Sequence, residues 1–279
     1  MQQFRPGGFT LLPPIVKNLL IINGLFFLAT IALGNAFGID LYRVLGLHFP
    51  GAQNFAPYQF VSYMFMHGGF THLFFNMFAL WMFGNVLENV WGPKRFLTYY
   101  FITGFGAALL HYAILYYQML PTLQAVNMVL ENPDHESVKA FFESDYFKVT
   151  SYEIQNNFRV FTRDYNSLIS SSPNEALVRA VNFLNQYKID FLNAPVVVGA
   201  SGAVFGILLA FGMLFPNSLI YLFFAIPIKA KYFVMMYGAM ELYFGIANRP
   251  GSNVAHFAHL GGMLFGYLLI RYWKSKGRF

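Results

Sequence analysis

The sequence predicts an all-α polytopic membrane protein, with six transmembrane helices and a helical insertion between the third and the fourth helix. Of its 279 residues, 57% are hydrophobic and only 11% are charged, whereas soluble domains carry about 25% charged residues. Several windows of about 18 or more residues are almost free of charge, which is typical of membrane-spanning helices. The sequence contains no cysteine, which excludes disulfide bonds and thiolate chemistry.

Six apolar runs are long enough to be read as membrane spans. We expect them at residues 18–37, 71–90, 96–117, 198–215, 232–246 and 254–272. No small-residue pattern ends the first run cleanly, so we expect a retained helix and not a cleavable signal peptide. Residues 217–231 are apolar but are interrupted by Pro227. We expect a re-entrant or interfacial turn there and not a seventh span.

Basic residues predict the orientation of the helices, because cytoplasmic loops carry an excess of lysine and arginine. Ten of the eighteen basic residues lie in four segments that six spans would place on one side: Arg5, Lys17, Lys94, Arg95, Lys229, Lys231, Arg271, Lys274, Lys276 and Arg278. We therefore expect both termini in the cytoplasm and the loops after the first, third and fifth helices on the outer side. We expect the membrane to be the inner membrane of a bacterium.

The loop after the third span is long and polar, and it holds nine of the twelve acidic residues. Within it, Ser172, Pro173 and Glu175 have the spacing of a helix start, with a cap, a proline at the first position and an acid in the first turn. The apolar residues that follow would lie on one face of this helix: Leu177, Ala180, Val181 and Leu184. We interpret the loop as a helical insertion on the outer side, acting as a spacer or packing cap, or binding substrate.

The insertion divides the chain into three parts. Residues 1–117 would hold the first three helices and the first outer loop, residues 118–190 the extracytoplasmic insertion, and residues 191–279 the last three helices. The six helices would together form one domain.

The segment GASG, residues 199–202, opens the fourth span. Gly199 and Gly202 flank Ser201, which allows a sharp entry into the helix and the close approach of another backbone. A serine at a helix start lies near unpaired N–H groups that can stabilise an oxyanion, so Ser201 could be a nucleophile. Small residues at this spacing are also common on packed helix faces in membranes, and this motif alone leaves both interpretations open.

The segment HFAHLGGMLFG, residues 256–266, opens the sixth span. We expect it to pack against the fourth span through glycines on both helices: Gly202 and Gly206 on one, Gly262 and Gly266 on the other. This packing would bring the ring of His259 to Ser201, and a histidine within hydrogen-bond reach makes serine a competent nucleophile. We interpret His256 as a polar residue at the outer interface.

The segment HGGFTHLFFN, residues 67–76, opens the second span. His72 and Asn76 are four residues apart and share a helix face. Both can donate hydrogen bonds to a developing negative charge without carrying a charge themselves, so they are a candidate oxyanion hole. The alternative is a structural hydrogen bond that ties this helix to a neighbour.

Zinc is the rival use of the histidines, for instance through His67, His72 and His259. No carboxylate accompanies them at ligand spacing and no H-E-x-x-H motif occurs, so we predict neither a metal nor another cofactor. Glu241 lies within the fifth span, where an acid is costly; it could be hydrogen-bonded to a loop or to water, or line a gate. Glu88, at the end of the second span, is interpreted as half of an interfacial ion pair or as a loop anchor.

Together these motifs resemble those of the rhomboid family of intramembrane serine proteases: G-A-S-G opening the fourth span, A-H-L-G-G (258–262) opening the sixth, and H-x-x-x-N in the second. The resemblance covers the six-span core and leaves out the insertion. It implies a rhomboid-like bundle with a Ser–His dyad and no third acid. By this resemblance Ser201 is the nucleophile and His259 the general base. The oxyanion hole would comprise the following groups: His72, Asn76 and the backbone N–H of Ser201.

Two departures from the family pattern are visible. Phe205 stands where many family members carry a tyrosine beneath the catalytic ring, so the stacking surface is kept and a hydroxyl is lost. Family members often carry a W-R pair in the first outer loop, and here residues 56–60, APYQF, occupy the approximate place. Contacts attributed to that pair are therefore not expected in this chain.

The resemblance implies a serine endopeptidase that cleaves single-span membrane proteins near the outer end of their helix, commonly after a small residue. The expected partners are such substrates and the lipid bilayer, with no nucleic acid. The loop at residues 247–257 could act as a lid and the fifth span as a gate. The alternatives are an inactive rhomboid-like protein that binds transmembrane helices, and a transporter or channel. A transporter would show repeat symmetry or several intramembrane charges, and neither is present.

Overall fold

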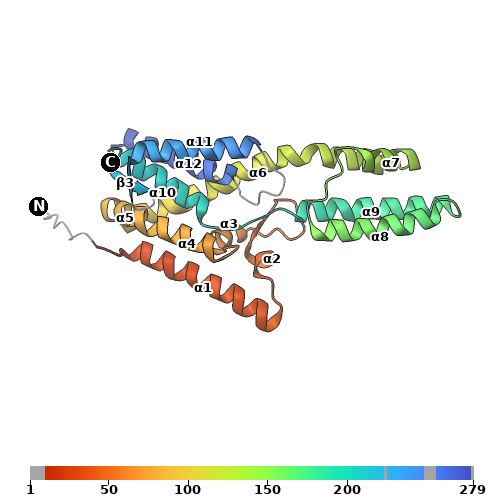
Figure 1. The fold of residues 1–279 in the computed structure, drawn as a ribbon, viewed down its shortest axis with the longest axis horizontal. Coiled ribbons are helices and arrows are strands. Elements are labelled where there is room, and N and C mark those ends of the chain that lie inside the picture. Colours follow the sequence, from red (N-terminus) through yellow and green to blue (C-terminus); the bar gives the residue numbers. More distant parts are fainter. Residues whose placement is uncertain (1–9, 223–224, 248–255, 278–279) are drawn as a thin grey trace, which may run out of the picture. The chain divides into compact units, whose positions relative to one another are not determined.

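The computed structural model describes residues 10–222, 225–247 and 256–277, and these are mostly helical (Figure 1). The predicted lid falls largely on residues 248–255, outside the described part of the chain. The chain divides into two compact units, whose segments are these: Met1–Gly46, Tyr58–Tyr112 and Val197–Phe279 in unit 1, and Leu47–Pro57 and Ala113–Val196 in unit 2. Unit 2 thus contains the predicted insertion.

Unit 1 consists of helices and one β-hairpin among its described residues. Its elements, in chain order, are α1 (Pro14–Phe37), α2 (Leu41–Leu45), α3 (Gln59–Ser62), η1 (Tyr63–Phe65), α4 (Phe70–Ala79), η2 (Leu80–Gly84), α5 (Asn85–Trp91), the first part of α6 (Pro93–Glu131), α10 (Ser201–Leu214), β3 (Leu219–Leu222), β4 (Ile226–Lys229), α11 (Ala230–Ala247) and α12 (His256–Ser275). Each of the six predicted spans coincides with helix: α1, the continuous α4–η2–α5, α6, α10, α11 and α12.

Within the described residues, three helices are long and apolar enough to cross a membrane: Pro14–Phe37, Phe70–Trp91 and Pro93–Glu131. Ser201–Leu214, which is α10, is a shorter apolar helix. It is buried along most of its length and packs most extensively against α12. The structure therefore has the several apolar helices that the composition predicted, with α10 at the centre of unit 1.

The ends of α1 are fixed by local chemistry. Pro14 stands at the first helical position, where its missing N–H costs nothing. The N–H groups of Ile15 and Val16 donate to the Glu88 carboxylate at 2.9 and 2.8 Å, which satisfies two groups that the helix itself leaves unpaired. Gly38 ends the helix in the left-handed conformation, at φ 67°. Glu88 is thus an anchor that joins α5 to the start of α1.

The second predicted span is not a uniform α-helix. A π-helical turn, Leu80–Gly84, joins α4 to α5. A Cβ at Gly84 would lie 3.1 Å from the ring of Phe96 and 3.2 Å from the side chain of Val16. Gly84 therefore lies at the point where side chains of α1 and α6 both approach the π-helical turn.

Within residues 217–231, the strands β3 and β4 pair antiparallel between α10 and α11. Leu219 pairs with Lys229 and Leu222 with Ile226, while residues 223–224 lie outside the described part. In its described residues this segment is not a seventh apolar helix, as expected from the sequence, but the strand pairing was not predicted. Pro227 cannot continue a helix, and an edge strand tolerates its missing N–H.

Unit 2 is a mostly helical unit formed by the second part of α6 with the following elements: β1 (Leu47–His48), α7 (His135–Glu143), α8 (Tyr152–Leu168) and α9 (Pro173–Asn193). The boundary between the units falls within β2 (Val196–Val197). The third predicted span was expected to end at Tyr117, but α6 continues through Pro121 to Glu131. Met119 and Val126 on this extension are buried in the core of unit 2. Burial of that apolar face offsets the backbone hydrogen bond that the proline removes.

The core of unit 2 is rich in aromatic residues, and its buried aromatic members are Phe141, Phe161, Phe183, Tyr187 and Phe191. The rings of Phe161 and Phe183 stack with centroids 4.6 Å apart. The start of α9 lies where the sequence predicts it, with Ser172 as the N-cap and Pro173 at the first position. The Ser172 side chain makes no capping hydrogen bond, so the proline and the packing of the helix define this start.

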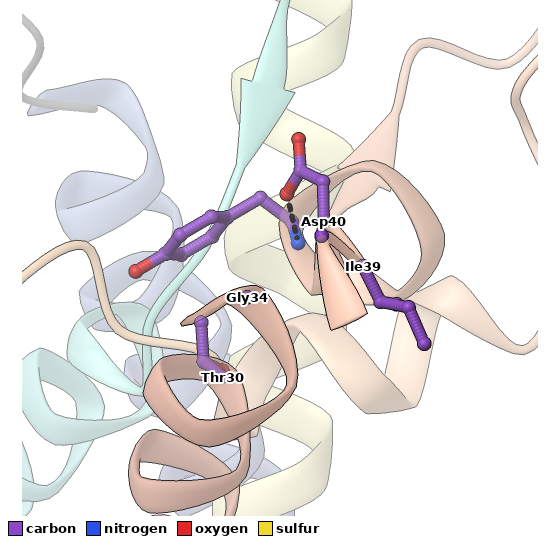
Figure 2. Close-up of a pocket in the computed structure, with 6 residues that line it drawn as sticks. Thr30, Gly34, Ile39 and Asp40 are labelled. Atoms are coloured by element: carbon purple, nitrogen blue, oxygen red, sulfur yellow. Dashed lines mark hydrogen bonds between the residues drawn. The ribbon is translucent and has the colours of Figure 1, made fainter. Parts of the chain in front are cut away.

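A pocket of about 310 Å³ lies beside the end of α1 and the start of α2 (Figure 2). Its lining residues are Thr30, Gly34, Gly38, Ile39, Asp40 and Tyr42. Asp40 caps α2 by accepting a hydrogen bond from the backbone N–H of Tyr42 at 2.8 Å. None of the predicted site residues lines this pocket.

Candidate active site

Ser201 is the first residue of α10, and the chain reaches it through a turn at Gly199. Gly199 has φ 122°, a conformation that residues with a side chain rarely adopt. Its N–H donates to the carbonyl of Tyr63 at 2.9 Å, which fixes the turn to η1. The first N–H groups of α10 have no acceptor within the helix and lie at its positive end. Ser201 therefore stands where a negative charge would be stabilised.

His259 lies in the first turns of α12 and faces Ser201. Its Nε2 is 2.9 Å from Ser201 Oγ, within hydrogen-bond distance. The residue is only 9% exposed, whereas Ser201 is partly exposed. The two residues are 58 positions apart in sequence, and the packing of α10 on α12 brings them together.

Glycines make this packing possible. A Cβ at Gly262 would collide with the carbonyl oxygen of Gly202, and a Cβ at Gly202 would lie 3.5 Å from the carbonyl oxygen of Ala258. Gly202 also faces the side chain of Ala107 on α6. The backbones of α10 and α12 are therefore in direct contact at the residue that follows Ser201 and about one turn after His259.

The other two predicted packing glycines face α6 more than they face each other. A Cβ at Gly206 would lie 2.6 Å from Thr103 Cβ, and one at Gly266 would collide with the hydroxyl of Tyr99. That hydroxyl donates to the carbonyl of Gly206 at 2.8 Å. The small-residue face is thus a junction of three helices, whereas the sequence alone suggested a pair.

Phe205 lies one turn after Ser201 and stacks on the imidazole of His259. The two ring centroids are 4.1 Å apart, with 5° between the planes. The ring of Tyr237 on α11 lies further along, with its centroid 6.2 Å from that of Phe205. The stack restricts rotation of the imidazole about the Cβ–Cγ bond of His259. This keeps Nε2 directed toward Ser201.

His72 and Asn76 both lie on α4, and His72 is close to the turn that precedes Ser201. A Cβ at Gly199 would lie 2.7 Å from Cε1 and 2.8 Å from Nε2 of His72. Asn76 is buried, and its Nδ2 donates to the backbone carbonyl of His72 at 3.0 Å. This leaves one amide hydrogen of Asn76 for another acceptor. The ring of His67 meets that of His72 edge-on, with centroids 5.0 Å apart.

A carboxylate that the sequence motifs did not predict lies on the side of the His259 ring opposite to Ser201. Oε2 of Glu241, on α11, is 3.0 Å from Nδ1 of His259 and 2.6 Å from Nδ1 of His256. His256, interpreted as an interface residue, therefore contacts Glu241 and not Ser201. The sequence signal for Glu241 was that it is the single acidic residue in an apolar span. Spacing along the chain could not show which residues its side chain contacts.

The same three residues are the group among the described residues that could hold a metal ion, with ligand atoms all within 4.8 Å of one another. They differ from the zinc set considered from the sequence, in which His67 and His72 took part. The donors of Glu241 and His256 are already in hydrogen-bond contact. A proton shared between them accounts for this distance without a metal.

A serine and a histidine held in hydrogen-bond contact by packed apolar helices define a membrane-embedded protein with a Ser–His site. The Rhomboid domain family matches residues 54–126 and 176–275, more than half of the chain. The chain belongs to the rhomboid family, which confirms the resemblance found in the motifs. Residues 127–175, which include α7 and α8, fall outside the match.

One relative is "Rhomboid-like protein 11, chloroplastic" from Arabidopsis thaliana, which is 33% identical over 100 residues. The match covers 33% of this chain and 34% of the plant protein. The chain thus spans about a third of the length of this relative. Family membership implies a polytopic helical membrane fold, and this agrees with the apolar helices described above.

Proposed function

We propose that this chain is an intramembrane serine endopeptidase in which Ser201 is the nucleophile and His259 the general base. The observation that carries the proposal is the 2.9 Å contact between His259 Nε2 and Ser201 Oγ. It is supported by the stacked ring of Phe205 and by membership of the rhomboid family. A serine becomes a competent nucleophile when a histidine accepts its proton.

The first half of the reaction makes an acyl-enzyme. His259 Nε2 takes the hydroxyl proton while Oγ of Ser201 bonds to the carbonyl carbon of a peptide, and the carbonyl oxygen becomes an oxyanion. The intermediate then expels the amine, which leaves with the proton that His259 returns. In the second half, water loses a proton to His259 and attacks the ester; the bond to Ser201 Oγ then breaks as His259 returns that proton to Oγ, and the acid product is released.

The oxyanion would be stabilised by His72, Asn76 and the backbone N–H of Ser201. The proximity of His72 to Gly199 and the spare amide hydrogen of Asn76 support this assignment. Each such donor contributes about 3 kcal/mol of transition-state stabilisation when its geometry is good. The N-terminus of α10 adds a fixed positive partial charge at the same place.

We propose that six helices span the membrane: α1, α4–η2–α5, α6, α10, α11 and α12. The basic residues on the loops that would share one side support an orientation with both termini in the cytoplasm. The active site would then open toward the outer face. The proposed substrates are single-span membrane proteins, cut near the outer end of their helix. The bacterial inner membrane is the location that we expect, while the plant relative's name assigns that protein to the chloroplast.

Covalent labelling with a fluorophosphonate tests the proposal. The reagent should label the purified chain, and neither Ser201→Ala nor His259→Ala should be labelled. Ser275→Ala is the matched control, because Ser275 is exposed at the end of α12 and donates only to the carbonyl of Tyr272. Cleavage of a co-reconstituted single-span protein should follow the same pattern.

Two outcomes would reject the protease assignment. Labelling and cleavage by Ser201→Ala would show that another nucleophile acts. A wild-type chain that retains bound transmembrane helices without labelling or cleavage would favour the inactive helix-binding protein instead.

A further inference from the structure

The catalytic histidine has a polar partner on each of its two nitrogens. Nε2 of His259 faces Ser201 Oγ at 2.9 Å, and Nδ1 faces Oε2 of Glu241 at 3.0 Å. The second contact has ion-pair distance but its direction departs from that of a linear hydrogen bond. Catalytic hydrogen bonds are often poorly aligned before substrate binds. The order hydroxyl, imidazole, carboxylate is that of a catalytic triad.

The face of α11 that carries Glu241 is shaped to approach α12. Gly238 and Gly245 lie three residues before and four residues after Glu241, so all three share one helix face. A Cβ at Gly238 would lie 3.3 Å from Cε of Met263, and a Cβ at Gly245 would lie 3.2 Å from the ring of Phe257. The two glycines therefore lie in tight contact with side chains of α12, and a larger residue at either position would require those side chains to shift by a few tenths of an ångström.

The carboxylate is held in place by a second histidine. Nδ1 of His256 lies 2.6 Å from the same Oε2 of Glu241. The side chains of Glu241 and His256 are 13% and 16% exposed. An acid within a membrane helix is costly unless it is paired. These contacts give Glu241 partners, both of which are histidines of the first turns of α12.

We propose that Glu241 is a positioning residue that completes a Ser201–His259–Glu241 triad; this inference rests on the proposed function. A carboxylate only accepts hydrogen bonds. Its presence at Nδ1 therefore holds the proton of neutral His259 on Nδ1 and leaves the lone pair of Nε2 free for the Ser201 proton. The same carboxylate stabilises the positive imidazolium that forms when the serine attacks.

A metal ion held by Glu241, His256 and His259 is the competing explanation. Donor atoms around a tetrahedral zinc ion lie about 3.3 Å apart, given metal–nitrogen and metal–oxygen distances near 2.0 Å. The 2.6 Å between Glu241 and His256 is shorter and fits a shared proton. If a chelator abolishes cleavage by the wild-type chain and zinc restores it, the triad assignment is overturned.

The central experiment compares Glu241→Gln with the wild-type full-length chain in proteoliposomes. Glutamine has the same size but can donate its amide hydrogen to Nδ1, which would hold the proton on the wrong nitrogen. We expect kcat to fall on the order of 100-fold with KM little changed. We expect Glu241→Asp to retain more activity than Glu241→Gln, because it keeps the charge.

Chemical rescue separates positioning from folding. In Glu241→Ala, added formate should restore part of kcat by supplying a carboxylate to Nδ1, and it should leave the wild type unchanged. Met235→Ala is the matched control, because Met235 is exposed on the same helix, and its kcat should stay within about twofold of the wild type. If Glu241→Gln and Glu241→Ala lose activity only as far as they lose thermal stability, without rescue, Glu241 is a structural latch and the proposal is wrong.

A spectroscopic measurement tests the inference without depending on enzyme activity. Nitrogen-15 NMR of labelled histidine should show neutral His259 protonated on Nδ1 in the wild type and not in Glu241→Gln. Protonation on Nε2 in the wild type would overturn the inference even if the chain is a protease. If the wild type neither labels nor cleaves but shows the Nδ1 proton, the protease proposal fails while the Glu241–His259 pairing stands.

Discussion

The rings of Phe205 and His259 lie almost parallel, 4.1 Å apart between centroids, although the residues belong to different helices. Stacked aromatic pairs contribute about 0.5–1.5 kcal/mol beyond their buried area. The stack therefore contributes to the direction of Nε2 as well as to the packing of α10 on α12.

Replacement of Phe205 by leucine should lower kcat by about threefold to tenfold, because the imidazole loses the flat surface that limits its rotation. Phe205→Tyr should keep kcat near the wild-type value, because the aromatic plane is unchanged. Steady-state cleavage kinetics on a single-span substrate measure both. Equal losses in the two variants would show that the ring plane has no orienting role.

Gly262→Ala should separate α12 from α10, because the new methyl group would meet the carbonyl oxygen of Gly202. We expect a loss of about 1–3 kcal/mol in the free energy of unfolding, together with a slower rate of fluorophosphonate labelling. Unfolding in a mixed-detergent titration gives the first quantity, and gel fluorescence over time gives the second.

Gly24→Ala provides the control for this substitution, since a Cβ at Gly24 in α1 would meet no atom within 4 Å. Alanine favours helix over glycine by up to about 1 kcal/mol, so this variant should be at least as stable as the wild type. If both variants behave alike, the contact between Gly262 and Gly202 does not determine the spacing of the helices.

Glu88→Ala should destabilise the chain, because the N–H groups of Ile15 and Val16 would lose their acceptor in a buried place. Hydrogen bonds to charged groups contribute about 1.5–3 kcal/mol each, so a loss of at least about 2 kcal/mol in the free energy of unfolding is expected. Glu143→Gln, in an exposed pair with Lys139, should change it by less than about 1 kcal/mol. A similar small change at Glu88 would contradict its role as an anchor of α1.

The phenol of Tyr187 should ionise at a higher pH than an exposed tyrosine. Burial raises the pKa of Tyr187 to about 12 from its ordinary value of 10.0, and a hydrogen bond with Lys148 partly opposes the rise. Because the folded-state pKa is the higher one, the stability from the neutral phenol is fully present below pH 10.0 and is lost as the pH rises toward about 12.

An ultraviolet titration of tyrosinate can test this value in unit 2. The difference between the wild type and Tyr187→Phe should be a single ionisation near pH 12. The stability advantage of the wild type over Tyr187→Phe should shrink over the same pH range. Ionisation of Tyr187 near its ordinary pKa would mean that the hydroxyl is not held between the N–H and the carbonyl of Lys148.

Local sequence signals predicted the apolar helices and the start of α9. Apolar runs marked the spans, and Ser172 with Pro173 marked the start of α9, because these signals act within one helix turn. The same reasoning placed the end of the third span at Tyr117 and did not predict that α6 continues as a helix to Glu131. Packing against the core of unit 2 decides where α6 ends, and no local sequence pattern carries this information. The β3–β4 hairpin was missed because its strands are too short to show an alternation.

By itself, the sequence determined the residue types of the candidate site. A serine between glycines and a histidine before glycines pointed to Ser201 and His259, because close helix approach needs positions without side chains. Only the tertiary structure decided which groups meet. In it, Gly206 and Gly266 face α6, and the carboxylate of Glu241 lies at Nδ1 of His259. Contacts between helices depend on rotation and crossing geometry, and these are set by the packing of all the helices together.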